Sequence, residues 1–545
     1  MNASASVAES GDFPRLEGIF PGAPDSLAAV YAEGHFAVSS LFPGQDSWQT
    51  RSWTEPARLP VEGLGAPSPS ARSKLEAILR GEGFLVSTGQ QPALFGGPLY
   101  VVHKALTAIE AARRLEAKSG VKCMALFWIT SDDHHWAEVA HTRLIDTSGN
   151  LQEFGLAPTK AREGTSVGPS VLPQDIEPEL ARFIASLPDS EFRPEIQRVL
   201  SEAYRPGRTY SEAFADVLAA LLPDKGWAWV DSANPAVRQA AVPLLRWALK
   251  SRNAAETAFR EGTEGVETLG FVPQMTFLPS STQLFWEVDG KRTRLYAGEE
   301  EGTLRLGRGG DPVTESDVLG ALEAHPEAFS PTASMRPVLE SWLLPVGATV
   351  LGPSEIGYWA QLGSLFQAAE VTMPAVVSRF GWRVVEKRIA RILDRLGMSP
   401  ETLAHPEALA STLVHDSVPA STCRSLQKLR DDIEAGFRHL ASSIEADLPG
   451  LKASSGKAHK AVAGALNDLE RAIESRTREQ HSTQVNQIVR AALYLYPDGV
   501  PQERVLSPFY FVARYGRSYL ETLTRAGEGR EIPLSADVAG SGGPG

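Results

Sequence analysis

The stretch Ser87–Ala105, STGQQPALFGGPLYVVHKA, follows the short apolar run Phe84–Val86 and leads into an amphipathic helical pattern over about 100–117. A second apolar run, Cys123–Thr130, comes next. Strand, glycine-rich loop, helix and strand in this order predict a βαβ unit of a parallel sheet. The chain is therefore predicted to be an α/β protein, with its informative loops at the carboxyl ends of strands, where open α/β sheets bind ligands.

Composition narrows the class of protein. The 545 residues are 43% hydrophobic, which is enough for a large core and, at about 150 residues per domain, suggests three or so domains. The net charge of -13 argues against nucleic acid or an anionic membrane as the main partner. The two cysteines, Cys123 and Cys423, form neither a disulfide framework nor a zinc signature. With no signal peptide or spanning segment expected, we predict a soluble cytoplasmic protein.

The loop at the start of the stretch Ser87–Ala105, here called the opening loop, resembles a phosphate-binding site in its composition. Its glycines permit close backbone approach, and the helix that follows offers unpaired N–H groups. The neutral Gln90 and Gln91 suit a sugar hydroxyl, a ribose or an amide. The loop matches neither a Walker A motif nor GxGxxG, so a tight turn with glycines used for packing is the alternative. The residues of this segment predicted to bind substrate or nucleotide are Thr88, Gly89, Gln90, Gln91, Phe95, Gly96, Gly97, Pro98, His103 and Lys104.

Ionisable side chains crowd the segment Ser131–His141, SDDHHWAEVAH, after the second apolar run. Three interpretations stay open. In the first interpretation, these side chains supply acid and base catalysts. In the second, they ligate a metal through His134, Glu138 and His141, which would share one helical face. In the third, they cap the strand and start a helix. A fixed ligand motif such as HExxH is absent, so no metal site is predicted. The predicted catalytic residues are Asp133, His134, Glu138 and His141.

A third informative segment is Gly352–Leu362, GPSEIGYWAQL, in which a Gly-Pro turn precedes a helix. A carboxylate near the start of that helix suits an ammonium group; the alternative is a capping glutamate beside core aromatic residues. Arginines in SMRP and MPAVVSRF suit a carboxylate or phosphate, or else form surface salt bridges. The predicted binding residues here are Arg336, Gly352, Glu355, Tyr358, Trp359 and Arg379.

From about residue 383 the pattern changes to apolar residues spaced by three and four, on both sides of Leu448-Pro449-Gly450. This pattern predicts two long helices that fold back as an antiparallel hairpin. The hairpin packs on a second subunit or forms a helical layer on the domain surface. The predicted divisions are 1–150 and 151–330 for the core with its insertions, 331–382 for the return to the core, 383–497 for the helical domain, 498–535 for a C-terminal segment packing on the core, and 536–545 for a disordered tail.

Five strings in this order resemble the bacillithiol-biosynthesis cysteine-adding enzymes, the BshC family of cysteine ligases, over about residues 80–520. The strings are TGQQPALFGGPLYVVHKALTAI (88–109), ALFWITSDDHHWAEVAH (125–141), MRPVLESWLLPVGATVLGPSEIGYWAQL (335–362), MPAVVSRF (373–380) and PDGVPQERV (497–505). The resemblance implies a Rossmann-like core with connecting insertions, a coiled-coil segment and a homodimer. It also implies that L-cysteine is joined to the amine of glucosaminyl-malate, the last step of bacillithiol biosynthesis.

The implied cosubstrate is ATP, with or without magnesium, and no tightly bound cofactor is expected. ATP would activate the cysteine carboxylate, with AMP or ADP as the by-product. Two positions depart from the family pattern: His135 stands in place of an acid and Ala140 in place of an asparagine. These changes fit either a tolerated substitution or a different amine acceptor. Two other functions remain open, a non-catalytic nucleotide-binding dimeric scaffold and a metal-dependent hydrolase that uses His134, Glu138 and His141.

Overall fold

The computed structural model describes residues 14–530 apart from 21, 24, 35, 157–163, 224–225 and 277. The chain divides into two compact units, Met1–Arg383 with Glu503–Gly545, and Val384–Gln502. The helical domain predicted from the sequence spans 383–497. The tail predicted to be disordered, 536–545, lies outside the described residues, as do residues 531–535 of the predicted C-terminal segment.

A six-stranded sheet with the order β14-β13-β3-β4-β7-β2 forms the centre of the first unit. Its strands are β2 (Leu64–Gly65), β3 (Gly83–Gln90), β4 (Lys122–Ile129), β7 (Trp227–Asp231), β13 (Val346–Leu351) and β14 (Ala375–Ser378). Five of them are parallel, and β2 pairs antiparallel with β7 at one edge. The predicted α/β class with a Rossmann-like, mostly parallel sheet is therefore confirmed.

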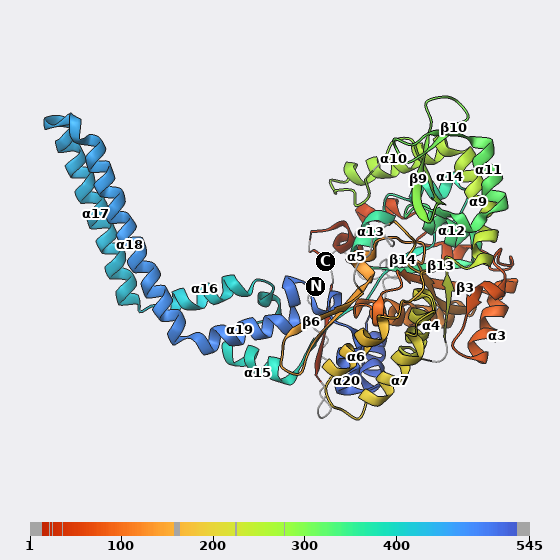
Figure 1. Ribbon diagram of the computed structural model, residues 1–545, viewed down its shortest axis with the longest axis horizontal. Coiled ribbons are helices and arrows are strands. Elements are labelled where there is room, and N and C mark those ends of the chain that lie inside the picture. Colours follow the sequence, from red (N-terminus) through yellow and green to blue (C-terminus); the bar gives the residue numbers. More distant parts are fainter. Residues whose placement is uncertain are drawn as a thin grey trace, which may run out of the picture. The chain divides into compact units, whose positions relative to one another are not determined.

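Apolar side chains cover both faces of this sheet. Along β4, Met124, Leu126 and Trp128 pack into the core that also contains residues of α3 (Pro69–Ala77) and α9 (Pro235–Lys250). The residues between them point to the opposite face, because successive strand residues alternate. Helix α4 (Tyr100–Ser119) packs along β3, β4 and β13 (Figure 1). A strand buried on both sides explains why the sequence shows an unbroken apolar run there.

Helix α4 begins at the predicted Tyr100 and continues to Ser119. Most of its residues are buried, and it ends at Gly120, whose φ of 70° lies in the left-handed region that favours glycine. The βαβ unit read from the opening stretch is present as predicted.

The rest of the first unit covers and extends this core. Its other helices are α1 (Leu27–Ala32), α2 (Ser47–Thr50), α5 (Trp136–Val139), α6 (Ile176–Ser186), α7 (Arg193–Ala203), α8 (Tyr210–Leu221), α10 (Arg252–Thr268), α11 (Glu315–Ala324), α12 (Arg336–Leu343), α13 (Pro353–Trp359), α14 (Gly363–Ala368), α20 (Pro508–Tyr515) and α21 (Ser518–Glu528). A second sheet has the order β11-β10-β9-β8-β12. Its strands are β8 (Ser281–Val288), β9 (Lys291–Ala297), β10 (Thr303–Leu306), β11 (Pro312–Thr314) and β12 (Phe329–Pro331). The remaining strands are β1 (Arg15–Ile19), β5 (His141–Ile145), β6 (Leu151–Gly155) and β15 (Gly381–Val385), where the division between the units falls.

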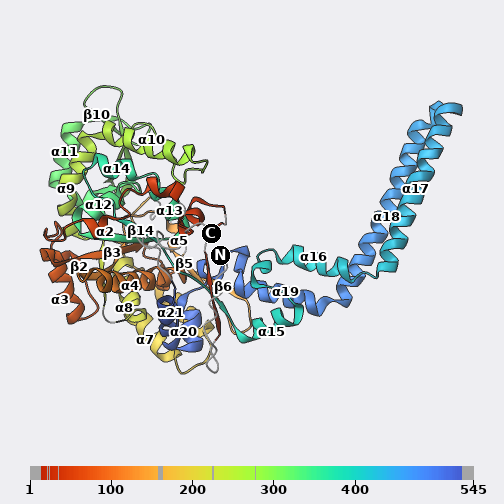
Figure 2. The ribbon, with the colours of Figure 1, turned by 180° about the vertical axis from the view of Figure 1, so that it is seen from behind.

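The second unit is helical. It contains α15 (Lys387–Leu396), α16 (Pro406–Ser417), α17 (Ala420–Asp447), α18 (Lys452–Gln480) and α19 (Ser482–Leu495). Figures 1 and 2 show α17 and α18 side by side, as the apolar spacing predicts, and Arg430 of α17 pairs with Glu470 of α18 at 2.8 Å. Helix α17 has no buried residue. Among the described residues, no helix combines the length and the apolar character needed to cross a bilayer.

Candidate active site

A cleft of about 360 Å³ opens at the carboxyl edge of the parallel sheet. It lies beside the ends of β3 and β13, which are neighbours in the sheet although more than 250 residues separate them. From β3 the chain continues to β4 on one side, and from β13 to β14 on the other, so the strand order reverses between them. Such a reversal leaves a crevice at the carboxyl ends, which is where open α/β sheets bind ligands.

Eleven of the predicted site residues line this cleft. They are Gly89, Gln90, Gln91, Lys104, Asp133, Glu138, Arg336, Gly352, Glu355, Tyr358 and Arg379. They come from four separate parts of the sequence, which the sheet order brings together.

Lys104 and Glu355 form the ion pair at the base of the cleft. Lys104 Nζ lies 2.8 Å from Glu355 Oε2 and donates a further hydrogen bond to the carbonyl oxygen of Gly89. Glu355 also accepts a hydrogen bond of 2.7 Å from the backbone N–H of Gly352, so it caps α13 as well. Burial lowers the pKa of Lys104, and the charge of Glu355 opposes that shift. Glu355 therefore caps α13, and its predicted binding of a ligand's ammonium group stays a prediction.

Arg336 lines the cleft from the first turn of α12. Its guanidinium donates to Glu340 Oε2 at 3.0 Å and to the Tyr358 hydroxyl at 3.1 Å. Burial raises the pKa of Glu340. The guanidinium is thus held in place by two partners while one part of it faces the cleft.

Arg379, His103 and Glu503 form a buried cluster behind the cleft. Arg379 donates to both carboxylate oxygens of Glu503, at 2.6 and 3.0 Å, and His103 Nδ1 lies 2.8 Å from Glu503 Oε2. Burial lowers the pKa of His103. His103 therefore does not line the cleft, although the adjacent Lys104 does.

Gln91 holds two carboxylates at the mouth of the cleft. Its amide nitrogen donates to Asp133 Oδ2 at 2.6 Å and to Glu138 Oε2 at 2.9 Å. Burial by itself raises the pKa of Asp133, but the hydrogen bonds from the His135 backbone N–H and from Gln91, together with the charge and ring hydrogen bond of His135, leave the pKa below its ordinary value. Asp133 is therefore an ionised acceptor that faces the cleft.

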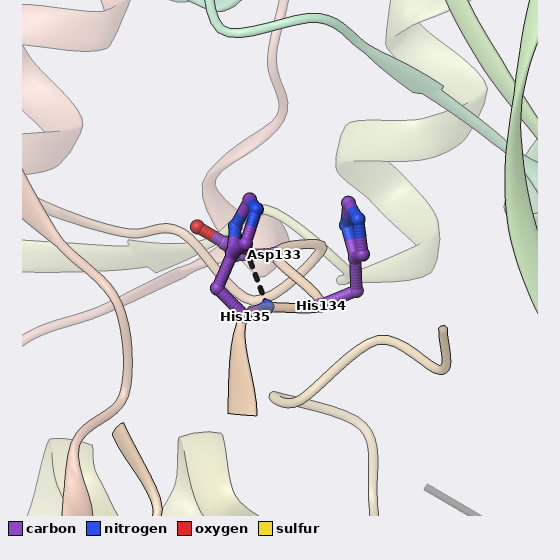
Figure 3. A group of neighbouring side chains, drawn as sticks. All are labelled: Asp133, His134 and His135. Atoms are coloured by element: carbon purple, nitrogen blue, oxygen red, sulfur yellow. Dashed lines mark hydrogen bonds and ion pairs between the residues drawn. The ribbon is translucent and has the colours of Figure 1, made fainter. Parts of the chain in front are cut away.

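His134 and His135 differ in their partners, and Figure 3 shows both beside Asp133, which is hydrogen-bonded to His135. His135 Nδ1 lies 2.6 Å from Asp133 Oδ1, and the two imidazole rings stack with centroids 4.5 Å apart. Arg292, from β9, lies 3.1 Å from His134 Nδ1. Burial and then the charge of Arg292 lower the pKa of His134, so its neutral form is favoured.

The helical face proposed for a metal site does not exist. Helix α5 spans only Trp136–Val139, His134 precedes it, and His141 begins β5. Within the part of the chain that the structure describes, the one group of three side chains close enough to hold an ion is Asp133, His134 and His135. The guanidinium beside His134 disfavours a second cation there. The structure therefore does not support a metal site at His134, Glu138 and His141.

The remaining predicted residues lie away from this cleft. Gly96 and Gly97 have φ values of 81° and 69°, and an added Cβ would come within 2.9 Å of Val217 and 2.8 Å of Ala93, so their shape serves packing. The others are buried or face elsewhere: Thr88 donates to the carbonyl of Val350, Phe95 packs edge-on to Tyr204, Trp359 lies in the core, and Pro98 and His141 line a second hollow of about 280 Å³. Their predicted part in ligand binding stays a prediction.

Five cleft residues were missed: Tyr100, Thr130, Pro353, Ser354 and Arg504. Tyr100 accepts a hydrogen bond of 2.9 Å from Gln90, and burial, followed by the charge of Glu355, raises its pKa to about 12. Tyr100 and Ser354 lie in the stretches Ser87–Ala105 and Gly352–Leu362. Their position at the start of a predicted helix could have indicated that they face the site. Arg504 lies in PDGVPQERV, but nothing local in the sequence brings that segment to the sheet.

Comparisons with known proteins agree with this architecture. The family model for the N-terminal Rossmann-like domain of bacillithiol biosynthesis BshC matches residues 61–380, and the model for its C-terminal coiled-coil domain matches residues 383–529. Curated relatives carry the name "Putative cysteine ligase BshC". The relative from Salinibacter ruber is 27% identical over 94% of this chain and 95% of its own length. Those from Koribacter versatilis and Geobacillus thermodenitrificans are 29% and 28% identical over 85% and 84% of each chain. The chain thus belongs to the BshC family of bacillithiol biosynthesis.

Proposed function

We propose that the protein is an ATP-dependent cysteine ligase that joins L-cysteine to the amine of glucosaminyl-malate. One observation carries the proposal: a single cleft at the reversal point of a Rossmann-like sheet contains Lys104, three arginines and the ionised Asp133. Cations suit the charge of phosphates and carboxylates, and a carboxylate suits a proton lost by an amine. The name of the curated relatives, "Putative cysteine ligase BshC", supports a cysteine ligase.

Amide formation from a free carboxylate requires activation. A cysteine carboxylate oxygen attacks a phosphorus of ATP, and either pyrophosphate or ADP leaves. The amine of the acceptor then attacks the activated carbonyl carbon, the new C–N bond forms, and AMP or phosphate leaves. The amine loses one proton in this step. Holding the two reactants together in one cleft supplies much of the acceleration.

Asp133 is the proposed acceptor of that proton. It lines the cleft, its Oδ2 is oriented by Gln91 and its Oδ1 by His135. His134 is a weaker candidate, because Arg292 occupies the side of its Nδ1. Glu355 and Lys104 at the base of the cleft are proposed to contact an ammonium group and an anion of the substrates.

We also propose that the protein works as a homodimer through the helical unit. Several leucines of α17 and α18 are about half exposed in the single chain, including Leu429, Leu440 and Leu469. Exposed apolar side chains spaced along two helices are typical of an interface that a second copy covers.

The first experiment is a mass-spectrometric thiol assay with purified protein, glucosaminyl-malate, cysteine and ATP. Formation of bacillithiol with an equal amount of AMP or ADP would establish the ligase and identify the activated intermediate. Nucleotide binding without any product would contradict the ligase and favour the non-catalytic scaffold. The matched control is the Asp133→Asn variant, which removes the proposed acceptor and keeps the shape of the side chain.

A further inference from the structure

Two hollows adjoin each other in the Rossmann-like unit. The first is the cleft of about 360 Å³, and the second, of about 280 Å³, lies between the opening loop, β5 and the segment after residue 503. The residues that line both are Gln90, Gln91, Tyr100, Glu138 and Arg504. Side chains at this boundary can reach a ligand in either hollow, so the two hollows form one site of two parts.

Arg504 is held at this boundary by the chain on both sides of it. The neighbouring Glu503 is locked by Arg379 and His103. Two residues further, the carbonyl of Leu506 accepts a hydrogen bond of 2.9 Å from the backbone N–H of Leu99. The backbone at Arg504 is therefore fixed on both sides while its side chain is exposed.

Arg504 forms no ion pair with a carboxylate among the described residues. The other four lysine and arginine side chains that line the two hollows each form an ion pair with a carboxylate. The pairs are Lys104–Glu355 at 2.8 Å, Arg336–Glu340 at 3.0 Å, Arg379–Glu503 at 2.6 Å and Arg143–Glu153 at 2.6 Å. The Arg504 side chain has no hydrogen bond or ion pair with any residue that the structure describes. Its planar guanidinium fork is thus available to a ligand, and it matches the oxygen pair of a carboxylate or phosphate.

We propose that Arg504 binds an anionic group of a substrate at the junction of the two hollows and determines which anionic substrate is accepted. The inference rests on the proposed function, in which the acceptor carries the carboxylates of malate and ATP carries phosphates. The arginines first expected to meet these carboxylates, Arg336 and Arg379, already have carboxylate partners of their own. Arg504 is therefore a binding residue, and it has no part in the proton transfer.

The test compares the Arg504→Ala and Arg504→Lys variants with wild type by isothermal titration, using glucosaminyl-malate and ADP as separate probes. Loss of a charge-assisted fork is expected to weaken the binding of one probe at least tenfold in the alanine variant, while the binding of the other changes less than twofold. The lysine variant keeps the positive charge but loses the planar pair of N–H donors. Its affinity is therefore expected to lie between those of wild type and the alanine variant. If only the affinity for glucosaminyl-malate falls, Arg504 binds a carboxylate. If only the affinity for ADP falls, Arg504 binds a phosphate.

Arg80→Ala is the matched control, because Arg80 is an exposed arginine that lines neither hollow. Thermal melting of each variant checks that it folds. Unchanged affinity for both probes in Arg504→Ala, together with an active wild-type enzyme, overturns this inference and leaves the proposed function standing. A wild-type protein that binds neither probe overturns both.

Discussion

Arg379 Nη2 and Glu503 Oε1 lie 2.6 Å apart, although the helical unit, residues 384–502, separates them in sequence. Both side chains are almost fully buried, at 2% and 0% exposed. Burial alone would raise the pKa of the Glu503 carboxyl, but the charge of Arg379 and the hydrogen bond from His103 hold it well below its ordinary value. The pair therefore ties the two parts of the chain that form the Rossmann-like unit and fixes the segment that carries Arg504.

Replacing Glu503 by Gln is expected to destabilise the Rossmann-like unit by about 3 kcal/mol, because it leaves the buried Arg379 without its counter-charge. Urea unfolding followed by tryptophan fluorescence measures the loss. The exposed Glu445→Gln on α17 is the control and should leave the unfolding midpoint unchanged. Equal midpoints for both variants would show that the buried pair contributes nothing.

The stability of the protein is expected to fall as the pH drops from about 7 to about 5. Burial lowers the pKa of His103, so the native state keeps this histidine neutral while the unfolded state takes up a proton below the ordinary value of about 6.5. The unfolded state then binds more protons, and the free energy of unfolding decreases on acidification. Glu503 contributes to the pH dependence only at lower pH, because in the unfolded state its carboxylate is protonated near its ordinary pKa of about 4.5.

His103→Gln is expected to reduce this pH dependence without abolishing it, since the pKa of His134 is shifted in the same direction. Unfolding midpoints measured at several pH values between about 5 and 7 give the slope. His325→Gln, which changes an exposed histidine, is the control. A slope that is the same in His103→Gln and wild type would refute the assignment.

Glu355→Gln is expected to shift the pH at which ADP binding weakens toward lower pH. The amide oxygen can still cap α13, but the negative charge beside Lys104 is lost. Burial already lowers the pKa of Lys104, and without Glu355 the pKa falls further, so the ammonium charge disappears at lower pH. Titration of ADP at increasing pH measures the shift. Glu82→Gln, outside the cleft, serves as comparison, and coincident profiles for the two variants would count against a role of Lys104 in anion binding.

Asp133→Asn is expected to lower kcat about 100-fold or more, in the range found for loss of a general base. His134→Gln should lower kcat less than tenfold, because His134 contacts Arg292 and does not line the cleft. Steady-state kinetics with the thiol assay compare the two. The reverse order of effects would move the proton acceptor from Asp133 to His134.

Replacing Leu429 and Leu440 by Glu is expected to convert a dimer into a monomer. Both leucines are nearly half exposed on α17, at 44% and 46%, and charge on them would prevent a second copy from covering the helix. Light scattering after size exclusion should show a change from twice 58.8 kDa to 58.8 kDa. Ser425→Glu is the control, because it adds charge to α17 without removing an apolar side chain. A wild-type protein that elutes as a monomer would exclude the dimer outright.

The elements of the fold follow from local patterns. Apolar runs predicted β3 and β4, the spacing of three and four predicted α17 and α18, and the Gly-Pro turn before Glu355 predicted the start of a helix. The prediction failed where the pattern was too short to define an element. Residues 134–141 fit one helical face, but α5 has only four residues and the chain then enters β5.

The site itself was only partly predictable. Adjacent residues on a helix point about 100° apart, so Lys104 faces the cleft while His103 faces Glu503, a difference that no local signal reveals. The sequence by itself determined strands β3 and β4, helices α4, α17 and α18, and the polar loops at strand ends, because these depend on periodicity over a few residues. Only the tertiary structure decided which polar side chains meet, since the sheet order and the burial of Glu503 bring together segments hundreds of residues apart.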